Sequence, residues 1–122
     1  MSRFFFTVGA LAAGVAVLAG AFGAHGLEGR VTPDRLETFK TGVTYQMYHA
    51  LALLFVGWAA AQGMSGPVTW AGYAFVAGIV IFSGSLYVLV LTDTGWLGAI
   101  TPLGGAAFLA GWGLLTWGVL TG

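Results

Sequence analysis

The chain contains three long segments without a single Asp, Glu, Lys or Arg. They are residues 4–27, 41–92 and 94–122, which are 24, 52 and 29 residues long. A helix of roughly 20 apolar residues crosses the hydrocarbon core of a bilayer, which is about 30 Å thick. Each outer segment can therefore hold one span, and the middle segment can hold two spans joined by a turn. The sequence predicts an all-α membrane protein, a bundle of four transmembrane helices in up-down order.

The composition indicates one integral membrane domain over residues 1–122. Hydrophobic residues make up 58% of the chain and charged residues 7%, whereas an ordinary soluble domain has about 25% charged residues. The net charge is zero, so nothing points to nucleic acid as a partner. Cysteine is absent, which excludes disulfides and thiolate metal sites. The lipid bilayer is the partner that this composition predicts.

The N-terminal segment is similar to a secretory signal, because Arg3 precedes an apolar stretch that ends in the small residues 19–24. Its charge-free run of 24 residues is longer than the apolar core of a typical signal. We therefore expect this segment to be retained as the first span.

Helix-breaking residues define the limits of the spans. Thr32 and Pro33 are the expected cap and first position of the second helix, which continues to about residue 61 and is roughly 43 Å long. This length exceeds the hydrocarbon thickness, so the first two turns form an N-terminal extension outside the membrane core. Turns are expected at residues 62–67 and 92–95, and a Thr-Pro pair at 101–102 begins the last helix. The predicted spans are residues 4–24, 41–61, 68–91 and 102–121.

Charge is distributed unequally between the two sides of the predicted bundle. The first and third connections lie on the same side in an up-down order, and seven of the eight charged residues lie there, with only Arg3 opposite. Three of the seven are basic, namely Arg30, Arg35 and Lys40. The positive-inside rule therefore places these two connections in the cytoplasm and both termini outside.

Stripes of small residues mark two expected helix contacts. Helices in lipid gain little from burying apolar surface and associate through close packing of small side chains. Small residues recur every four positions in the first span and every seven in the last. These packing positions are Ala12, Ala16, Gly20 and Ala24 in the first span, and Gly104, Gly111 and Gly118 in the last.

Polar side chains near the charged side form the candidate site. They are His25, Tyr45, Gln46, Tyr48, His49 and Asp93. An ionisable group at membrane depth is a candidate for function and normally has a partner. Three interpretations are open: hydrogen bonding between helices, handling of protons or a solute, and haem ligation by the two histidines.

Asp93 and three polar residues of the third span are expected to have structural roles. Asp93 is expected to cap its turn or to pair with Arg30, Arg35 or Lys40. Ser83, Ser85 and Tyr87 in the third span are expected to bond to neighbouring helices, as polar residues in lipid often do.

Enzymatic chemistry is not predicted. The chain offers two histidines but no cysteine and no carboxylate deep in a span, so neither an activated nucleophile nor a metal-ligand set is available. Small multidrug exporters have a similar size but depend on a carboxylate in the first span, and residues 4–27 contain none. No metal and no cofactor are expected, with haem on His25 and His49 as the alternative.

Several motifs resemble those of a known family. They are GAFGAHGL (20–27), TYQMYHALALL (44–54), GSLY (84–87), ITPLGG (100–105) and GW (111–112). These motifs cover nearly the whole chain and are similar to the transmembrane protein 256-like family, also called domain of unknown function 423. The resemblance implies a four-span protein of the bacterial inner membrane and supplies no activity.

Two functional hypotheses follow. The first is a structural or accessory membrane protein that forms homo-oligomers or joins a larger membrane complex through its glycine stripes. The alternative is an oligomeric channel or carrier for protons or a small solute that uses His25, Tyr45 and His49.

Overall fold

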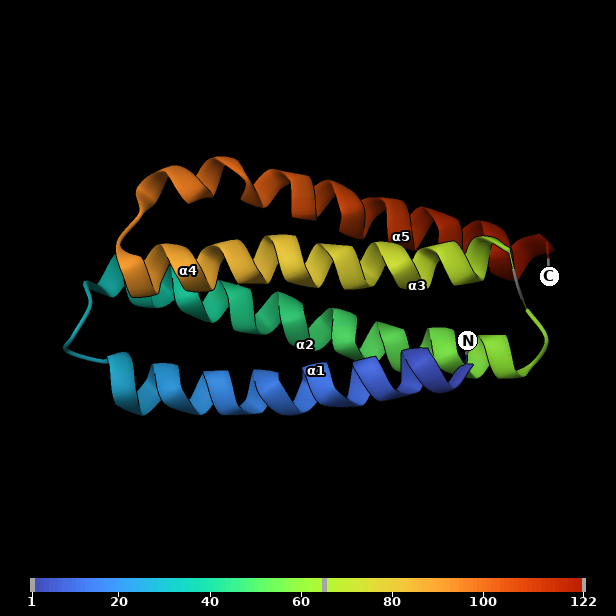
Figure 1. Cartoon of the computed structure of the whole chain (residues 1–122), viewed down its shortest axis with the longest axis horizontal. Helices are drawn as coiled ribbons and strands as arrows, with labels where there is room; N and C mark the ends of the chain where they lie inside the picture. Colours follow the sequence, from blue (N-terminus) through green and yellow to red (C-terminus); the bar gives the residue numbers. More distant parts are fainter. Residues whose placement is uncertain (1, 65, 122) are drawn as a thin grey trace.

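The computed structural model describes residues 2–64 and 66–121, and within these residues the chain is all-helical with four long antiparallel rods (Figure 1). The first rod is α1 (Ser2–Phe22), which continues into the π-helical turn η1 (Gly23–Leu27). The second is α2 (Pro33–Ala61). The third consists of α3 (Pro67–Gly78), the π-helical turn η2 (Ile79–Ser83) and α4 (Gly84–Thr92). After the 3₁₀ turn η3 (Gly95–Ala99), α5 (Thr101–Thr121) forms the fourth.

The start of α2 follows from its sequence. The Oγ1 atom of Thr32 accepts a hydrogen bond from the backbone N–H of Arg35 at 3.3 Å, and Pro33 occupies the first helical position. A cap of this kind pairs one of the amides that the first turn leaves without a partner. The predicted cap and the predicted helix from residue 33 to 61 are confirmed.

The other predicted boundaries agree closely with the structure. The turn at 62–67 contains Gly63 and Gly66, both with positive φ (90° and 65°), and Pro67 begins α3. Ser65 of that turn, and residues 1 and 122 at the ends of the predicted domain, lie outside the described residues. The short connector before α5 is a single 3₁₀ turn. How much of each helix lies within lipid stays a prediction.

The sequence predicts one continuous span over residues 68–91, but the third rod is not a uniform α-helix. At η2 the backbone widens into a π-helical turn, and Ser83 at its end is fully buried. The Ser83 hydroxyl donates to the carbonyl of Gly42 on α2 at 2.7 Å. This contact between distant parts of the chain accompanies the π-turn, and nothing in the local sequence indicates the π-turn.

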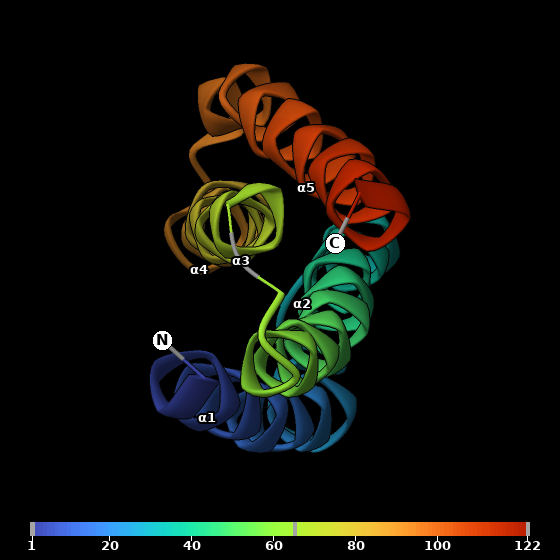
Figure 2. The ribbon, with the colours of Figure 1, turned by 90° about the vertical axis from the view of Figure 1, so that its right-hand side faces the viewer.

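Each rod packs on the one that follows it in the chain. α1 lies against α2, α2 lies against the third rod, and α5 lies against the third rod, so α1 and α5 are the two outer helices (Figure 2). The main core lies between the rods at the end opposite the charged connections. Its fully buried side chains include Phe5, Leu53, Val56, Val68 and Phe75.

The small-residue stripes face neighbouring helices. On α1, Ala16 is 1% exposed, and an added Cβ on Gly20 would lie 3.5 Å from Val43 on α2. On α5, Gly104, Gly111 and Gly118 are buried. They lie against Phe82, Phe75 and Val68 respectively, all on the third rod. Both stripes therefore allow helices within one bundle to approach closely.

The two ends of the bundle differ. The α1–α2 and α4–α5 connections lie together at one end, and both termini lie at the other end with the α2–α3 connection (Figure 1). Three segments, Ser2–Leu27, Pro67–Thr92 and Gly95–Thr121, are long and apolar enough to cross a membrane. α2 is as long, but its charged first turns and the polar residues 44–49 lower its hydropathy. The bundle thus has four rods, three of which qualify as spans by length and composition.

Candidate functional site

The six residues of the predicted polar cluster lie at two levels of the bundle. His25 and Asp93 lie near the charged end, each on a different connection. Tyr45, Gln46, Tyr48 and His49 lie together about midway along α2. The structure therefore brings four of the six residues together and leaves the other two apart.

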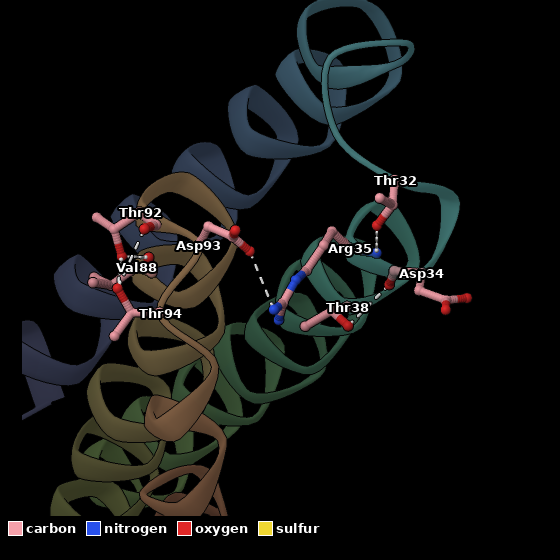
Figure 3. A network of polar contacts seen from close by, with 8 residues as sticks. All are labelled: Thr32, Asp34, Arg35, Thr38, Val88, Thr92, Asp93 and Thr94. Carbon is pink, nitrogen blue, oxygen red and sulfur yellow. Dashed lines mark hydrogen bonds and ion pairs between the residues drawn. The ribbon is translucent and has the colours of Figure 1, made fainter.

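Asp93 pairs with the extension of α2. Its Oδ1 atom lies 3.2 Å from Nη2 of Arg35, and this ion pair joins the α4–α5 connection to α2 (Figure 3). The Asp93 side chain is 83% exposed and that of Arg35 is 33% exposed. The predicted pairing of Asp93 with a basic residue of the same side is confirmed. Since exposed ion pairs contribute about 0–1 kcal/mol, this contact adds little to the stability of the bundle.

His25 lies apart from His49. It is exposed within η1, and the neighbouring Gly23 lies against Phe39 on α2. His49 is ten residues further along α2 than Phe39, which corresponds to about 15 Å of helix rise. The two imidazoles are therefore not positioned to bind a haem iron from opposite sides.

His49 uses both of its ring nitrogens within the protein. Nδ1 lies 2.7 Å from the carbonyl oxygen of Tyr45, so Nδ1 carries a proton and donates it. Nε2 accepts a hydrogen bond from the indole N–H of Trp112 on α5 at 3.1 Å. The residue is 4% exposed, and its ring stacks on Phe108 with centroids 3.6 Å apart and planes 7° apart. The imidazole is thus neutral and held in one tautomer, with no lone pair free for a metal or a proton.

Gln46 joins three helices. Its Nε2 donates to the carbonyl of Ala12 on α1 at 2.8 Å, and its Oε1 accepts from the hydroxyl of Tyr87 on α4 at 2.7 Å. Near the start of α4, the hydroxyl of Ser85 lies 2.6 Å from the hydroxyl of Thr101, and this contact joins the third rod to α5. With the Ser83 bond to α2, the expected interhelical bonds of Ser83, Ser85 and Tyr87 are confirmed.

Trp112 is the hydrogen-bond partner of His49, and it was not predicted from the sequence. A tryptophan in the middle of a span, away from the membrane interface, has an indole N–H that needs an acceptor when buried. Trp112 is 11 residues after Thr101 on α5, and its position in mid-helix is the signal that could have indicated its role. Which side chain accepts the hydrogen bond depends on the register between α2 and α5.

An aromatic pocket of about 630 Å³ lies between α2 and α5, next to His49. Tyr45 and Tyr48 are 40% and 58% exposed there. The residues that line the pocket are Tyr45, Tyr48, His49, Leu51, Phe82, Gly105, Phe108, Leu109 and Trp112. A second, more polar pocket of about 530 Å³ adjoins the Arg35–Asp93 pair.

The described residues contain no group of three potential metal ligands among His, Cys, Asp and Glu. In the same part of the chain, every buried side-chain nitrogen and oxygen has a hydrogen-bond partner. The polar groups in the middle of the bundle are therefore arranged to join helices.

Comparison with known proteins identifies the family. The family model described as "Protein of unknown function (DUF423)" matches residues 19–105, which include Gln46 and His49. The chain belongs to this family. The resemblance seen in the motifs of the sequence is confirmed.

Two relatives are similar to this chain over nearly their whole length. The UPF0382 membrane protein YwdK of Bacillus subtilis is 52% identical over 111 residues, which cover 90% of both chains. The UPF0382 membrane protein SAB0533 of Staphylococcus aureus is 50% identical over 113 residues, which cover 93% of this chain and 92% of the relative. No solved structure matches the chain.

The relatives are bacterial and are named as membrane proteins, and none of these names carries an enzymatic activity. Their names agree with the three segments that are long and apolar enough to cross a bilayer. The prediction of an integral membrane protein from an uncharacterised family is therefore confirmed.

Proposed function

We propose that this protein is an accessory membrane protein with four transmembrane helices that binds a larger membrane complex or further copies of itself. The observation that carries this proposal is the complete use of its buried polar groups. Within the described residues, no buried side-chain nitrogen or oxygen lacks a hydrogen-bond partner, and His49 has neither ring nitrogen free. A catalyst or proton carrier needs at least one such group available to a substrate.

The outer helices provide surfaces for a partner. Leu18 on α1 and Leu120 on α5 are 71% and 80% exposed, and they face away from the bundle. A Cβ added at Gly14 on α1 or at Gly113 on α5 would meet no atom within 4 Å. Exposed small residues of this kind let a helix of another chain approach closely in lipid. These surfaces are the ones we assign to partner contact.

α2 is the fourth span in this proposal. It lies between α1 and the third rod, and its second half buries Leu53, Val56 and Ala59 against them. Its polar residues Gln46 and His49 are 4% exposed each, so they do not face lipid. A helix whose polar groups are paired inside the bundle can cross the hydrocarbon core despite a lower hydropathy.

The location follows from the helical architecture and the charge. Membrane helices with an excess of basic residues on one side orient that side toward the cytoplasm. Arg30, Arg35 and Lys40 lie in or next to the α1–α2 connection and the first turns of α2, and Arg3 lies at the start of α1, at the other end. We therefore place the protein in the inner membrane, with both termini outside.

Purification in mild detergent tests the accessory role. Tagged wild-type protein is expected to recover at least one membrane protein in constant proportion, or a homo-oligomer of fixed size. Gly14→Leu and Gly113→Leu place bulk on the outer helices and are expected to reduce this recovery. Gly105→Leu changes only the pocket between α2 and α5 and serves as the control. A monomer that recovers nothing, together with solute flux in liposomes that depends on the protein, would contradict the proposal.

The chain has no cysteine, so single cysteines can report its orientation. Glu28→Cys lies in the α1–α2 connection and Gln62→Cys lies at the end of α2. A maleimide that cannot cross the membrane is expected to label the second variant in intact cells, and the first only after the cells are opened. The reverse pattern would contradict the orientation, and equal labelling of both in intact cells would contradict an α2 that spans the membrane.

A further inference from the structure

The pocket between α2 and α5 presents two hydrogen-bond donors that the bundle does not use. Tyr45 and Tyr48 line this pocket and are partly exposed. Among the described residues, neither of their hydroxyls has a hydrogen-bond partner. Gln46 and His49, which lie beside them on the same helix, are fully paired. The two phenols are therefore distinct from the interhelical network.

The position of these phenols suits a ligand that arrives from the bilayer. Tyr45 is five residues beyond Lys40, the last charged residue of α2, and this corresponds to about 7.5 Å of helix rise. Side chains on a helix tilt toward its N-terminus, so both tyrosines leave the helix toward the charged end. They lie where hydrocarbon replaces water and where a phenol gains most from an acceptor.

The walls of the pocket are formed by flat rings. Six of its nine lining residues are aromatic or imidazole side chains. His49 and Phe108 are stacked, and the Tyr45 ring lies within 13° and 16° of their planes at centroid distances of 6.3 and 6.5 Å. Parallel ring faces favour a flat conjugated ring through offset stacking, whereas an acyl chain gains only dispersion contacts from them.

We propose that this pocket binds a lipid-soluble planar ring that carries carbonyl oxygens, the chemical class of the membrane quinones. The hydroxyls of Tyr45 and Tyr48 donate to the carbonyl oxygens, and the ring lies against Phe108 and Tyr45. The isoprenoid tail leaves the pocket over Leu51 and Leu109, which are 53% and 75% exposed. The volume of about 630 Å³ lies in the range of small-molecule sites, about 300–1,000 Å³.

The site does not depend on the accessory role, because it uses a face that the outer surfaces of α1 and α5 do not include. It also leaves His49 in its structural role, since Trp112 already occupies Nε2. Binding therefore requires no rearrangement of the bundle.

Fluorescence titration of the full chain in detergent tests the site, with menaquinone-4 as the probe. Trp112 lines the pocket, so bound quinone is expected to quench its emission and to saturate near one equivalent. Gly105→Leu fills the pocket, and its Cβ would meet Phe82 at 4.0 Å, an ordinary contact that leaves the fold intact. This variant is expected to bind at least tenfold more weakly. Gly84→Leu on α4, where a Cβ meets nothing within 4 Å, is the matched control and is expected to bind as the wild type does.

The double variant Tyr45→Phe, Tyr48→Phe keeps the rings and removes the donors, and a several-fold loss of affinity is expected. If Gly105→Leu does not fold, Leu109→Trp blocks the same pocket from an exposed position. Quenching that does not saturate, or equal affinity in the wild type and the blocked variant, would overturn the proposal. Displacement of the probe by phosphatidylglycerol at equal mole fraction would also overturn it, because the pocket would then select an acyl chain.

Discussion

The indole nitrogen of Trp112 lies 3.1 Å from Nε2 of His49 and donates a hydrogen bond to it, which joins α5 to α2 inside the bundle. The other ring nitrogen of His49 donates to the carbonyl of Tyr45 on the same helix at 2.7 Å. A protonated imidazole would place an N–H opposite the indole N–H, so this geometry admits only the neutral ring. His49, in the middle of the bundle, thus connects two helices.

Trp112→Phe keeps an aromatic ring and removes the donor to His49. The free energy of unfolding is expected to fall by about 1 kcal/mol, because Nε2 loses its partner in a buried site. Titration with SDS, followed by circular dichroism, measures this change. Trp117→Phe changes a residue that is 58% exposed and is expected to have no effect.

A double-mutant cycle separates the hydrogen bond from packing. His49→Leu removes the acceptor, so adding Trp112→Phe to it is expected to cost less than Trp112→Phe alone. Strictly additive effects would show that the bond contributes nothing. His49→Leu is also expected to disturb folding more than any single change at residues 62–67, where Gln62, Gly63 and Gly66 are exposed.

Gln46→Leu is expected to lower the free energy of unfolding by about 1–3 kcal/mol. The substitution removes the bonds to Ala12 on α1 and to Tyr87 on α4, and it leaves both partners unpaired in a partly buried place. Tyr87→Phe alone is expected to cost about 0.5–1.5 kcal/mol. Thermal unfolding in detergent compares the variants. In the Gln46→Leu background, Tyr87→Phe is expected to cost nothing, because it removes a hydroxyl that already lacks its acceptor.

The helix limits could be predicted from sequence because local chemistry sets them. Thr32 and Pro33 define the start of α2, and the glycines of the 62–67 turn adopt the positive φ that other residues resist. Pairing of Asp93 with a basic residue at the same end could also be predicted, since alternating helices bring the first and third connections together, and Arg35 was one of three candidates. These features depend on short segments or on helix order alone.

The candidate site could be predicted only in part, because the register between helices is not a local property. Gln46 bonds to Ala12, and His25 is 13 residues further along the α1 rod, which corresponds to about 20 Å. The sequence placed both histidines in one half of the bundle but could not supply this offset. The π-turn η2 and the Trp112 bond likewise depend on contacts between segments far apart in the chain.

Gly104→Ala is expected to destabilise the bundle by about 1–3 kcal/mol. A Cβ at this position of α5 would lie 2.7 Å from the Cα of Phe82, so the backbones of α5 and the third rod would have to move apart. Gly113→Ala on the same helix meets nothing within 4 Å and is expected to be neutral or slightly stabilising, because Ala favours the helix. Melting temperatures of the two variants in one detergent check the contrast. Equal melting temperatures would show that α5 does not pack through Gly104.

Asp93→Gly tests whether backbone strain or the ion pair matters more at the charged end. Asp93 ends α4 in the left-handed conformation, with φ 53° and ψ 43°. Glycine relieves a strain of about 1 kcal/mol, and loss of the exposed pair with Arg35 costs about 0–1 kcal/mol. The melting temperature is therefore expected to stay the same or to rise slightly.

Two further variants separate these contributions. Asp93→Val loses the pair and adds a branched side chain to the strained position, so its melting temperature is expected to fall below that of the wild type. Arg35→Gln loses only the pair and is expected to change little, with a still smaller effect at high salt because the charges are exposed. If Arg35→Gln destabilised the bundle as much as Asp93→Val does, the ion pair would matter more than the backbone conformation.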